Sequence, residues 1–369
     1  MTKVELYQQH LNALLTTNLD NCQKEKIDEI LAKFIQCLPN NGKLYKYRSI
    51  EGDAFEYAYD GLENGYLWMA RVDTLNDDLE GTLNFDLEED IQVAKEEFLS
   101  QPWKYLNNFL QQNTNLRKDL PPIDRFCMDQ IMKCVDQSTG EIDMKKAVDL
   151  FIAKGLTRQN AKRYIEKVKS WVQNAIEDAI PVLRDTVDGL VGINKINRNN
   201  IFVYSMAITH DADNMWGYYA NNNRGFCIEY DFNKARFLPY ETKSKLCRCY
   251  EVHYQEQKPK FSFQKTFQYL IDGQNNQVLF KQIEAEFVEQ LVTKTGGWDK
   301  ETEWRILLFQ LKDCKLYADL VSKIILDERI LNTVNAQKLI ALAQSRNWKI
   351  EIRKLNVLGT KHIYEEYVG

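Results

Sequence analysis

A long helical stretch interrupts the strand pattern of this chain, and the interruption limits the folds open to it. Runs rich in Val, Ile, Tyr and Phe before residue 71 and after residue 200 indicate strands, whereas residues 90 to about 191 carry a helical pattern. A sheet that uses both sets of strands must join segments more than a hundred positions apart. The sequence therefore predicts an α+β protein with a split sheet and a large helical insertion.

Turn signals and changes of pattern divide the chain into four predicted segments. They are N-terminal helices over 1–40, the first half of the α+β core over 41–89, the helical insertion over 90–198, and the second half of the core over 199–369. The last segment ends in a strand, helix, strand, strand order. We also predict a helix over 52–63 that Gly65 closes.

Composition excludes several classes of protein. The chain has 369 residues, with 53 acidic and 48 basic side chains and a net charge of -5, which argues against a strongly basic nucleic-acid wrapper but leaves a local basic face open. No run approaches the ~18 consecutive apolar residues of a membrane span, and the N-terminus lacks the pattern of a secretory signal. Eight cysteines without framework spacing indicate reduced thiols, so we expect a cytoplasmic protein without a membrane partner.

Known catalytic motifs give little direct help. The chain has no glycine-rich nucleotide loop, no H-E-x-x-H and no G-x-S-x-G. Cys247 and Cys249 form a C-x-C pair, but no histidine nearby in the sequence completes a zinc set, so we predict no metal site. Three clusters of charged and aromatic residues at predicted strand ends remain as candidate sites.

The first cluster is a predicted strand with alternating tyrosine and cationic residues. Lys46 and Arg48 share one face of it, with Tyr45 and Tyr47 on the other. The planar guanidinium of Arg48 can hold a phosphate through two hydrogen bonds, or it can pair with an acidic side chain of the following loop. That loop contains Asn76 and Asp77, which are candidate ligand contacts or simply part of an Asx-type turn.

The second cluster combines aromatic residues with polar ones. A short helix capped by Asp213 would place Trp216 and Tyr219 on one side, where they can stack on an aromatic ring or belong to the core. The neighbouring asparagines and Arg224 favour a ligand wall. Ser205, on an earlier predicted strand, has no base near it in the sequence.

The third cluster precedes an apolar strand. Glu301 and Glu303 are two residues apart, so on a strand their carboxylates point to one face and, if dry, raise each other's pKa. Such a carboxylate can stabilise an oxocarbenium-like sugar or accept a proton. The alternative is a solvated strand end in which both glutamates pair with Arg305 and Lys300.

A basic helix face lies in the predicted insertion. Its residues are Lys154, Arg158, Lys162 and Lys169, together with Arg163 and Lys167, and only Glu166 opposes them. The face can contact a phosphate backbone, or it can be a solvated helix surface.

Taken in order, these motifs resemble the bacterial domain-of-unknown-function family 2971. The segments that carry the resemblance are Leu44–Ser49, Leu67–Trp68, Asn76–Glu80, Val203–Ser205, Trp216–Ala220, Gly225–Tyr230 and Trp298–Arg305. The match covers residues 43 to about 368, least well in the insertion, and departs from the family pattern at Asp78 and Tyr204. The family name states no activity.

The order of the functional residues also resembles the R-S-E class of ADP-ribosyltransferases. That resemblance implies a split mixed or antiparallel β core, with NAD as the substrate that donates ADP-ribose. It implies that Arg48 grips NAD, Ser205 steadies the glutamate, Glu303 holds the nicotinamide ribose and Glu301 activates an acceptor. Tyr47, Trp216 and Tyr219 are then the stacking residues.

Two functions therefore remain as expectations. The first is an NAD-dependent ADP-ribosyltransferase of bacterial defence, toxin action or stress response, acting on an unidentified protein or nucleic acid. The second is a binding or sensing module for nucleic acid or protein in a defence system. A transferase requires Arg48, Ser205 and Glu303 to meet in one cleft, whereas a binding module needs only the continuous basic face. A nuclease has weaker support, since no spacing links Asp77 to Glu301.

Overall fold

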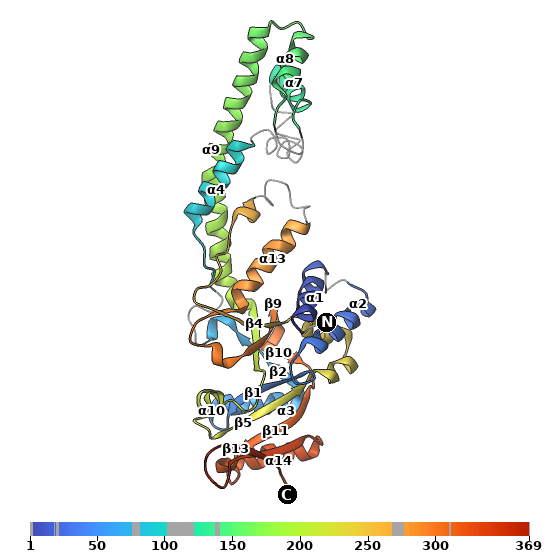
Figure 1. The fold of residues 1–369 in the computed structure, drawn as a ribbon, viewed down its shortest axis with the longest axis vertical. Helices are drawn as coiled ribbons and strands as arrows, with labels where there is room; N and C mark the ends of the chain where they lie inside the picture. Colours follow the sequence, from blue (N-terminus) through green and yellow to red (C-terminus); the bar gives the residue numbers. More distant parts are fainter. Residues whose placement is uncertain are drawn as a thin grey trace. The chain divides into compact units, whose positions relative to one another are not determined.

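The structure is a computed structural model (Figure 1), and it divides into two compact units. It describes residues 3–17, 19, 22–75, 82–101, 122–136, 141–267, 277–309 and 311–368. The first unit, here called the sheet unit, comprises Met1–Thr82, Lys195–Pro259 and Val288–Gly369. The second, the helical unit, comprises Leu83–Asn194 and Lys260–Phe287. Each is described by itself.

A mixed sheet is the centre of the sheet unit. Within the described residues it has nine strands, eight of them in the order β13-β12-β11-β5-β1-β4-β9-β6, with β3 alongside β4. Neighbours are antiparallel except β11 and β12, which run parallel. The bounds are β1 Lys43–Ser49, β3 Ala70–Arg71, β4 Ile201–Ala207, β5 Gly225–Asp231, β6 Cys249–Glu251, β9 Glu303–Phe309, β11 Val321–Asp327, β12 Lys349–Leu355 and β13 His362–Glu366. The α+β class predicted from the sequence is confirmed.

The sheet opens between β1 and β4. Strand β1 pairs with β5 from Lys43↔Asp231 to Ser49↔Gly225, but it meets β4 only at Tyr45↔Ala207. Strand β4 pairs with β9 along the whole of its other edge. Strand β3 pairs with β4 at Ala70↔Val203, so it must lie on the same edge of β4 as β1. Between these two contacts, no strand among the described residues pairs with the main chain around Ser205 on that side.

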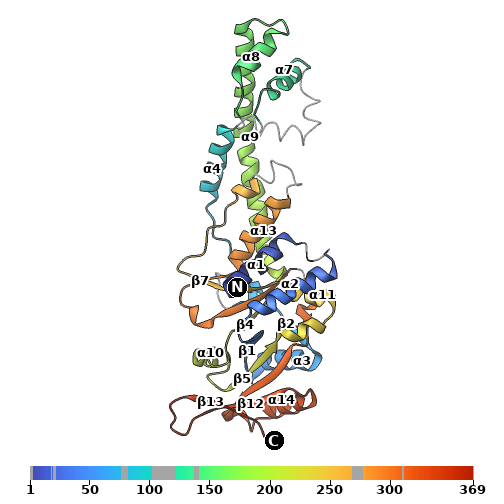
Figure 2. The ribbon, with the colours of Figure 1, turned by 45° about the vertical axis from the view of Figure 1, so that its right-hand side comes forward.

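Helices cover the sheet because their apolar residues recur every three or four positions. Helix α2 (Lys24–Cys37) buries Ile27, Ile30, Leu31, Phe34 and Ile35. The other helices of this unit with eight or more residues are α1 (Lys3–Thr16), α3 (Gly52–Asn64) and α14 (Val334–Ser345). Helix α3 ends at Gly65, whose φ of +70° is the left-handed conformation that glycine adopts without strain, as predicted. Figure 2 shows α14 beside β12.

Short elements complete the sheet unit. They are β2 (Tyr66–Trp68) antiparallel to β10 (Lys315–Tyr317), β7 (His253–Gln255) parallel to β8 (Thr293–Thr295), α10 (Asp213–Tyr219), α11 (Tyr240–Leu246) and the 3-10 turns η1 (Val72–Thr74), η2 (Arg198–Asn200), η3 (Phe232–Phe237), η4 (Asp299–Glu301), η5 (Lys312–Cys314) and η6 (Glu328–Ile330). Of these, η1, β8, α10 and η4 contribute residues to the site described below.

The helical unit has two apolar cores. Helices α7 (Pro122–Met132), α8 (Met144–Ile152) and the start of α9 (Arg158–Asn197) share one of them. Helix α4 (Leu87–Ser100), Val187 of α9 and residues near Phe263 form the other. The unit thus includes Lys260–Phe287, which the sequence analysis assigned to the second half of the core, and α13 (Gln277–Val292) crosses its boundary. In the described part of the chain, no helix is both long and apolar enough to cross a bilayer.

Candidate functional site

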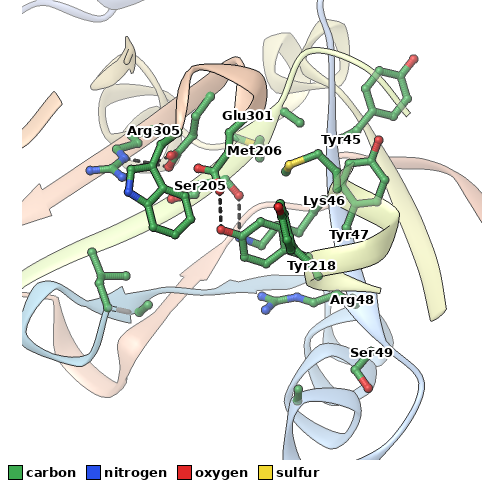
Figure 3. A pocket seen from close by; sticks show the side chains of 18 of the residues that line it. Tyr45, Lys46, Tyr47, Arg48, Ser49, Ser205, Met206, Tyr218, Glu301 and Arg305 are labelled. Atoms are coloured by element: carbon green, nitrogen blue, oxygen red, sulfur yellow. Dashed lines mark hydrogen bonds and ion pairs between the residues drawn. The ribbon is translucent and has the colours of Figure 1, made fainter. Parts of the chain in front are cut away.

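A cavity of about 390 Å³ lies where β1 and β4 separate (Figure 3). This volume is within the ~300–1,000 Å³ typical of small-molecule sites. The cavity belongs entirely to the sheet unit. Its lining residues are Tyr45, Lys46, Tyr47, Arg48, Ser49, Ala54, Ala70, Thr74, Leu75, Ser205, Met206, Ala207, Met215, Tyr218, Tyr219, Lys294, Trp298, Glu301, Glu303 and Arg305. Four of these side chains are cationic and two are anionic, so the cavity favours an anionic ligand.

Two cations on β1 have no carboxylate partner in the described part of the chain. The Lys46 Nζ donates to the main-chain oxygen of Ser205 at 2.6 Å and lies 5.1 Å from the centre of the Tyr204 ring. Burial, reinforced by the positive charge of Arg48, lowers the pKa of Lys46 to about 7. The Arg48 Nε is buried without a hydrogen-bond partner among the described residues. In Figure 3 the Arg48 side chain extends from the β1 ribbon into the cavity.

An unpartnered buried donor beside a second cation is costly, because neither charge is neutralised and one N–H has lost its water. An anion with several oxygens would relieve both costs at once. The predicted phosphate contact of Arg48 therefore has a matching environment, and Lys46 is a second contact that the sequence analysis placed on the same strand face.

The two glutamates share a buried lysine on the opposite wall. Lys294, on β8, lies 2.8 Å from Glu301 Oε2 and 2.8 Å from Glu303 Oε2. The Arg305 Nε and Nη2 donate to the two oxygens of Glu303 at 2.7 and 3.2 Å. The Tyr219 hydroxyl donates to Glu301 Oε1 at 2.5 Å. Figure 3 shows the Glu301 carboxylate directed towards the aromatic side of the cavity.

The local backbone and the charges differ from the sequence prediction for these glutamates. Glu301 ends η4 and Thr302 is left-handed at a φ of 43°, so only Glu303 belongs to a strand. We expected the carboxylates to raise each other's pKa, and for Glu303 this is wrong. Burial does raise its pKa, but the charges of Arg305 and Lys294 outweigh burial and hold the pKa well below its usual range. The alternative of a solvated strand end is also wrong, because both side chains are buried, but its pairing of Glu303 with Arg305 is confirmed.

Of the predicted aromatic contacts, Tyr47 and Tyr219 line the cavity and Trp216 does not. The Tyr47 hydroxyl donates to the Thr209 carbonyl at 2.8 Å, and its ring meets Trp216 edge-on at 5.4 Å. Trp216 is fully buried. Tyr218, 75% exposed, also lines the cavity, although the sequence analysis did not select it.

The remaining predicted residues have mixed outcomes. Ser205 lines the cavity, but among the described residues its hydroxyl has no hydrogen bond to either glutamate. Arg224 is exposed and outside the lining, while Asn76 and Asp77 lie outside the described residues. Asp213 does not cap α10, because Ala212 occupies the cap position without a side-chain hydrogen bond.

The sequence analysis missed Lys294, the cation that joins the two glutamates. It lies outside the three predicted clusters and carries no motif of its own. The only signal was its position seven residues before Glu301, which could have indicated a turn that brings the two together.

Helix α10 forms one wall because the segments at its ends are tightly constrained. Asn221, Asn222 and Asn223 are left-handed, at φ values of 49°, 52° and 64°, a conformation asparagine tolerates better than most residues. A Cβ on Gly225 would lie 2.3 Å from the Arg48 carbonyl oxygen, so only glycine lets β5 begin this close to β1. The Gly225 position thereby brings α10 next to the Arg48 side of the cavity.

A second buried arginine holds α10 from the other side. Arg353 Nη1 donates to Asp327 at 2.9 Å, and its Nη2 donates to Asp213 at 2.7 Å. Its guanidinium lies 4.6 Å from the centre of the Trp216 ring. The carboxylate of Asp213 thus connects the start of α10 to β12, and Tyr219 at the end of the same helix reaches Glu301.

Residues 215–306 match the family model described as "Protein of unknown function (DUF2971)". The matched stretch runs from α10 to β9 and includes Tyr219, Lys294, Glu301 and Glu303. No curated protein and no solved structure matches the chain. The family match supports the resemblance drawn from the sequence motifs over this part of the chain.

Proposed function

We propose that the cavity binds NAD and that the protein transfers ADP-ribose from NAD to an acceptor. The observation that carries the proposal is the convergence of Arg48, Ser205, Glu301 and Glu303, which come from β1, β4, η4 and β9, on one cavity. A transferase of the predicted class requires Arg48, Ser205 and Glu303 to meet in one cleft. The resemblance to the R-S-E class supplies the identity of the substrate.

The diphosphate of NAD would bind beside Arg48 and Lys46. A guanidinium suits phosphate because its N–H groups match two phosphate oxygens, and the ammonium adds a point charge. The buried Nε of Arg48 would gain the partner that it lacks among the described residues. Tyr218 and Tyr219 would contact a ring of the ligand, since both line the cavity.

In the proposed reaction the bond between ribose C1′ and the nicotinamide nitrogen breaks, and nicotinamide leaves with the bonding electrons. Positive charge develops on the ribose, and Glu303 is the carboxylate that faces it in an ionised form, because Arg305 and Lys294 hold its pKa low. One aimed carboxylate contributes roughly 3 kcal/mol to such a transition state. The acceptor atom then bonds to C1′ and passes its proton to Glu301.

Calorimetric titration of the purified protein with NAD tests binding. We expect Arg48→Ala to weaken binding at least tenfold and Arg48→Lys to restore part of it, because lysine keeps the charge but loses the two-point contact. Arg71→Ala is the matched control, since Arg71 is exposed, pairs with Asp73 and lies outside the lining. The absence of wild-type binding up to millimolar NAD would refute the proposal.

Nicotinamide release tests the chemistry. We expect Glu303→Gln to abolish release while NAD still binds, with circular dichroism confirming that the variant is folded. Wild-type release by this variant would remove Glu303 from the mechanism. Glu301→Gln should preserve hydrolysis of NAD by water better than transfer, because its assigned partner is the acceptor.

A further inference from the structure

A row of basic side chains runs along the start of α9 in the helical unit. Arg158, Lys162 and Lys169 of this helix are exposed, and Lys154, also exposed, lies in the turn before it. Ala161, Ile165 and Val168 of the same helix are buried in the core shared with α7 and α8. The four exposed basic residues are here called the basic row. The buried positions fix the rotation of the helix: at about 100° per residue their centre lies roughly 75° around the helix from the three row residues of α9, so the row lies beside the buried stripe, with its side chains exposed.

Helix geometry makes the row narrow and straight. At about 100° and 1.5 Å per residue, Arg158, Lys162 and Lys169 lie within roughly 40° of one another and span roughly 16 Å of helix. In the described part of the chain, no ion pair involves any member of the basic row, whereas the nearby Lys167 lies 4.0 Å from Asp124. The row therefore presents charges that pair with no acidic side chain among the described residues of its own unit.

The charge of this segment contrasts with that of the whole protein. Residues 154–169 contain six basic side chains and one acidic side chain, a net charge of +5, in a chain whose net charge is -5. A strongly basic segment in a chain whose net charge is negative indicates a strongly anionic partner.

The neighbouring side chains distinguish between anionic partners. A helix that binds a membrane surface carries apolar side chains beside its basic ones. Here Thr157, Gln159, Asn160 and Ser170, which neighbour row residues in the sequence, are exposed, and polar side chains of these types contact phosphate and sugar groups in nucleic-acid complexes. A straight row of cations also fits the regular spacing of phosphates on a nucleic-acid backbone.

We propose that the basic row binds the phosphate backbone of nucleic acid without reading its sequence. This inference rests on the helical unit and does not depend on the function proposed for the cavity. It implies that base identity has little effect on binding and that salt has a large one.

Fluorescence anisotropy of the full-length protein with a labelled 20-base-pair DNA duplex tests the inference. Four phosphate contacts predict a slope of about -3.6 for log affinity against log salt, which is about a 150-fold loss of affinity between 50 and 200 mM salt. A duplex of different sequence should bind equally, and an RNA duplex in a parallel arm shows which nucleic acid is preferred.

Charge reversal identifies the surface. Lys162→Glu with Lys169→Glu should weaken binding at least tenfold and reduce the salt slope by about 2. Lys338→Glu with Lys349→Glu is the control, because both lysines are exposed in the sheet unit and the net charge changes equally. Equal loss in the two double variants would overturn the proposal, since net charge alone would then explain binding.

Other probes complete the test. No binding of any duplex at 50 mM salt, or tighter binding of vesicles with anionic lipid or of polyglutamate, would overturn the proposal. Arg48→Ala should leave duplex binding unchanged, and the Lys162 and Lys169 variants should leave NAD binding unchanged. The proposals for the two units can therefore fail separately.

Discussion

Replacing Lys294 by methionine tests whether one buried ammonium holds the two glutamates of the cavity. Its side chain is 8% exposed, and those of Glu301 and Glu303 are 5% and 6% exposed. Methionine has a similar length and no charge, so the variant keeps most of the packing. Glu303 keeps Arg305 and Glu301 keeps Tyr219, but the site loses the cation that both carboxylates share.

Removing one partner from a buried ion pair costs about 3–5 kcal/mol, because the remaining charge stays out of water. We therefore expect Lys294→Met to lower the free energy of unfolding by about 3–5 kcal/mol at pH 7.5. Lys33→Met is the matched control. Lys33 pairs with Glu29 at 2.7 Å, but both side chains are well exposed, so this variant should change stability little.

The pH dependence supplies a sharper criterion. The folded-state pKa of Glu303 is lowered, so its contribution to stability is present above the unfolded pKa and is lost as the pH falls through the folded pKa. Without Lys294 this pKa is held down less strongly, so the variant has less of that stability to lose. The difference between wild type and variant should therefore stay constant from pH 7.5 down to the ordinary glutamate pKa near 4.5 and shrink as the pH falls below it.

Urea unfolding followed by tryptophan fluorescence at pH 7.5 and pH 3 measures both effects, since Trp298 and Trp304 flank the glutamates in the sequence. Circular dichroism, which also reports on the helical unit, separates the two transitions if they do not coincide. A cost below about 1 kcal/mol at pH 7.5, or one that does not shrink at pH 3, would refute the argument from an unneutralised buried charge.

Three further predictions follow from the site. Because the pKa of Lys46 is lowered to about 7, its positive charge declines as pH rises from 6 to 8, and calorimetry should show NAD binding weakening over that range. Lys46→Arg should remove most of this pH dependence. An unchanged pH profile in the variant would contradict the prediction. Gly225→Ala should lower the melting temperature sharply, because its Cβ would lie 2.3 Å from a carbonyl oxygen. Gly217→Ala is at a helical position with open space around it and should stabilise the protein by about 0.5–1 kcal/mol. Similar melting temperatures for the two variants would contradict the argument. Tyr219→Phe removes a hydrogen bond to a carboxylate and should lower the free energy of unfolding in urea by about 1.5–3 kcal/mol. An unchanged free energy would show that the hydroxyl contributes nothing to stability.

Local patterns in the sequence were sufficient to find most elements of the sheet unit. The predicted strand with alternating tyrosine and cationic residues corresponds to β1, and the helix over 52–63 with its terminal Gly65 matches α3 closely. The strand, helix, strand, strand order predicted for the end of the chain corresponds to β11, α14, β12 and β13. The helices were predictable because their apolar residues recur at helical spacing, and the strands because runs of apolar and aromatic residues lie between turn signals.

Pairings across long sequence separations were not predictable. Strand β2 pairs with β10, about 250 residues later, and β7 pairs with β8 on the far side of Lys260–Phe287. Each of these strands has only three residues, too few for a periodic pattern. The pKa of Glu303 was predicted with the wrong sign for the same reason. Two carboxylates spaced two apart carry no information about Lys294, which reaches them through the β7 and β8 pairing.

The opening between β1 and β4 also affects how rigid the sheet is. Seven residue pairs join β1 to β5 and seven join β4 to β9, whereas Tyr45↔Ala207 alone joins β1 to β4. The sheet is therefore mechanically weakest at the cavity, where the connections between its two halves include this ladder contact, the Lys46 hydrogen bond to Ser205 and the hydrogen bond between the Tyr204 and Tyr230 hydroxyls. A ligand that touches both Arg48 and Glu301 would act as a non-covalent cross-link between these halves. Hydrogen exchange of the β1 and β4 amides should then slow when the cavity is filled.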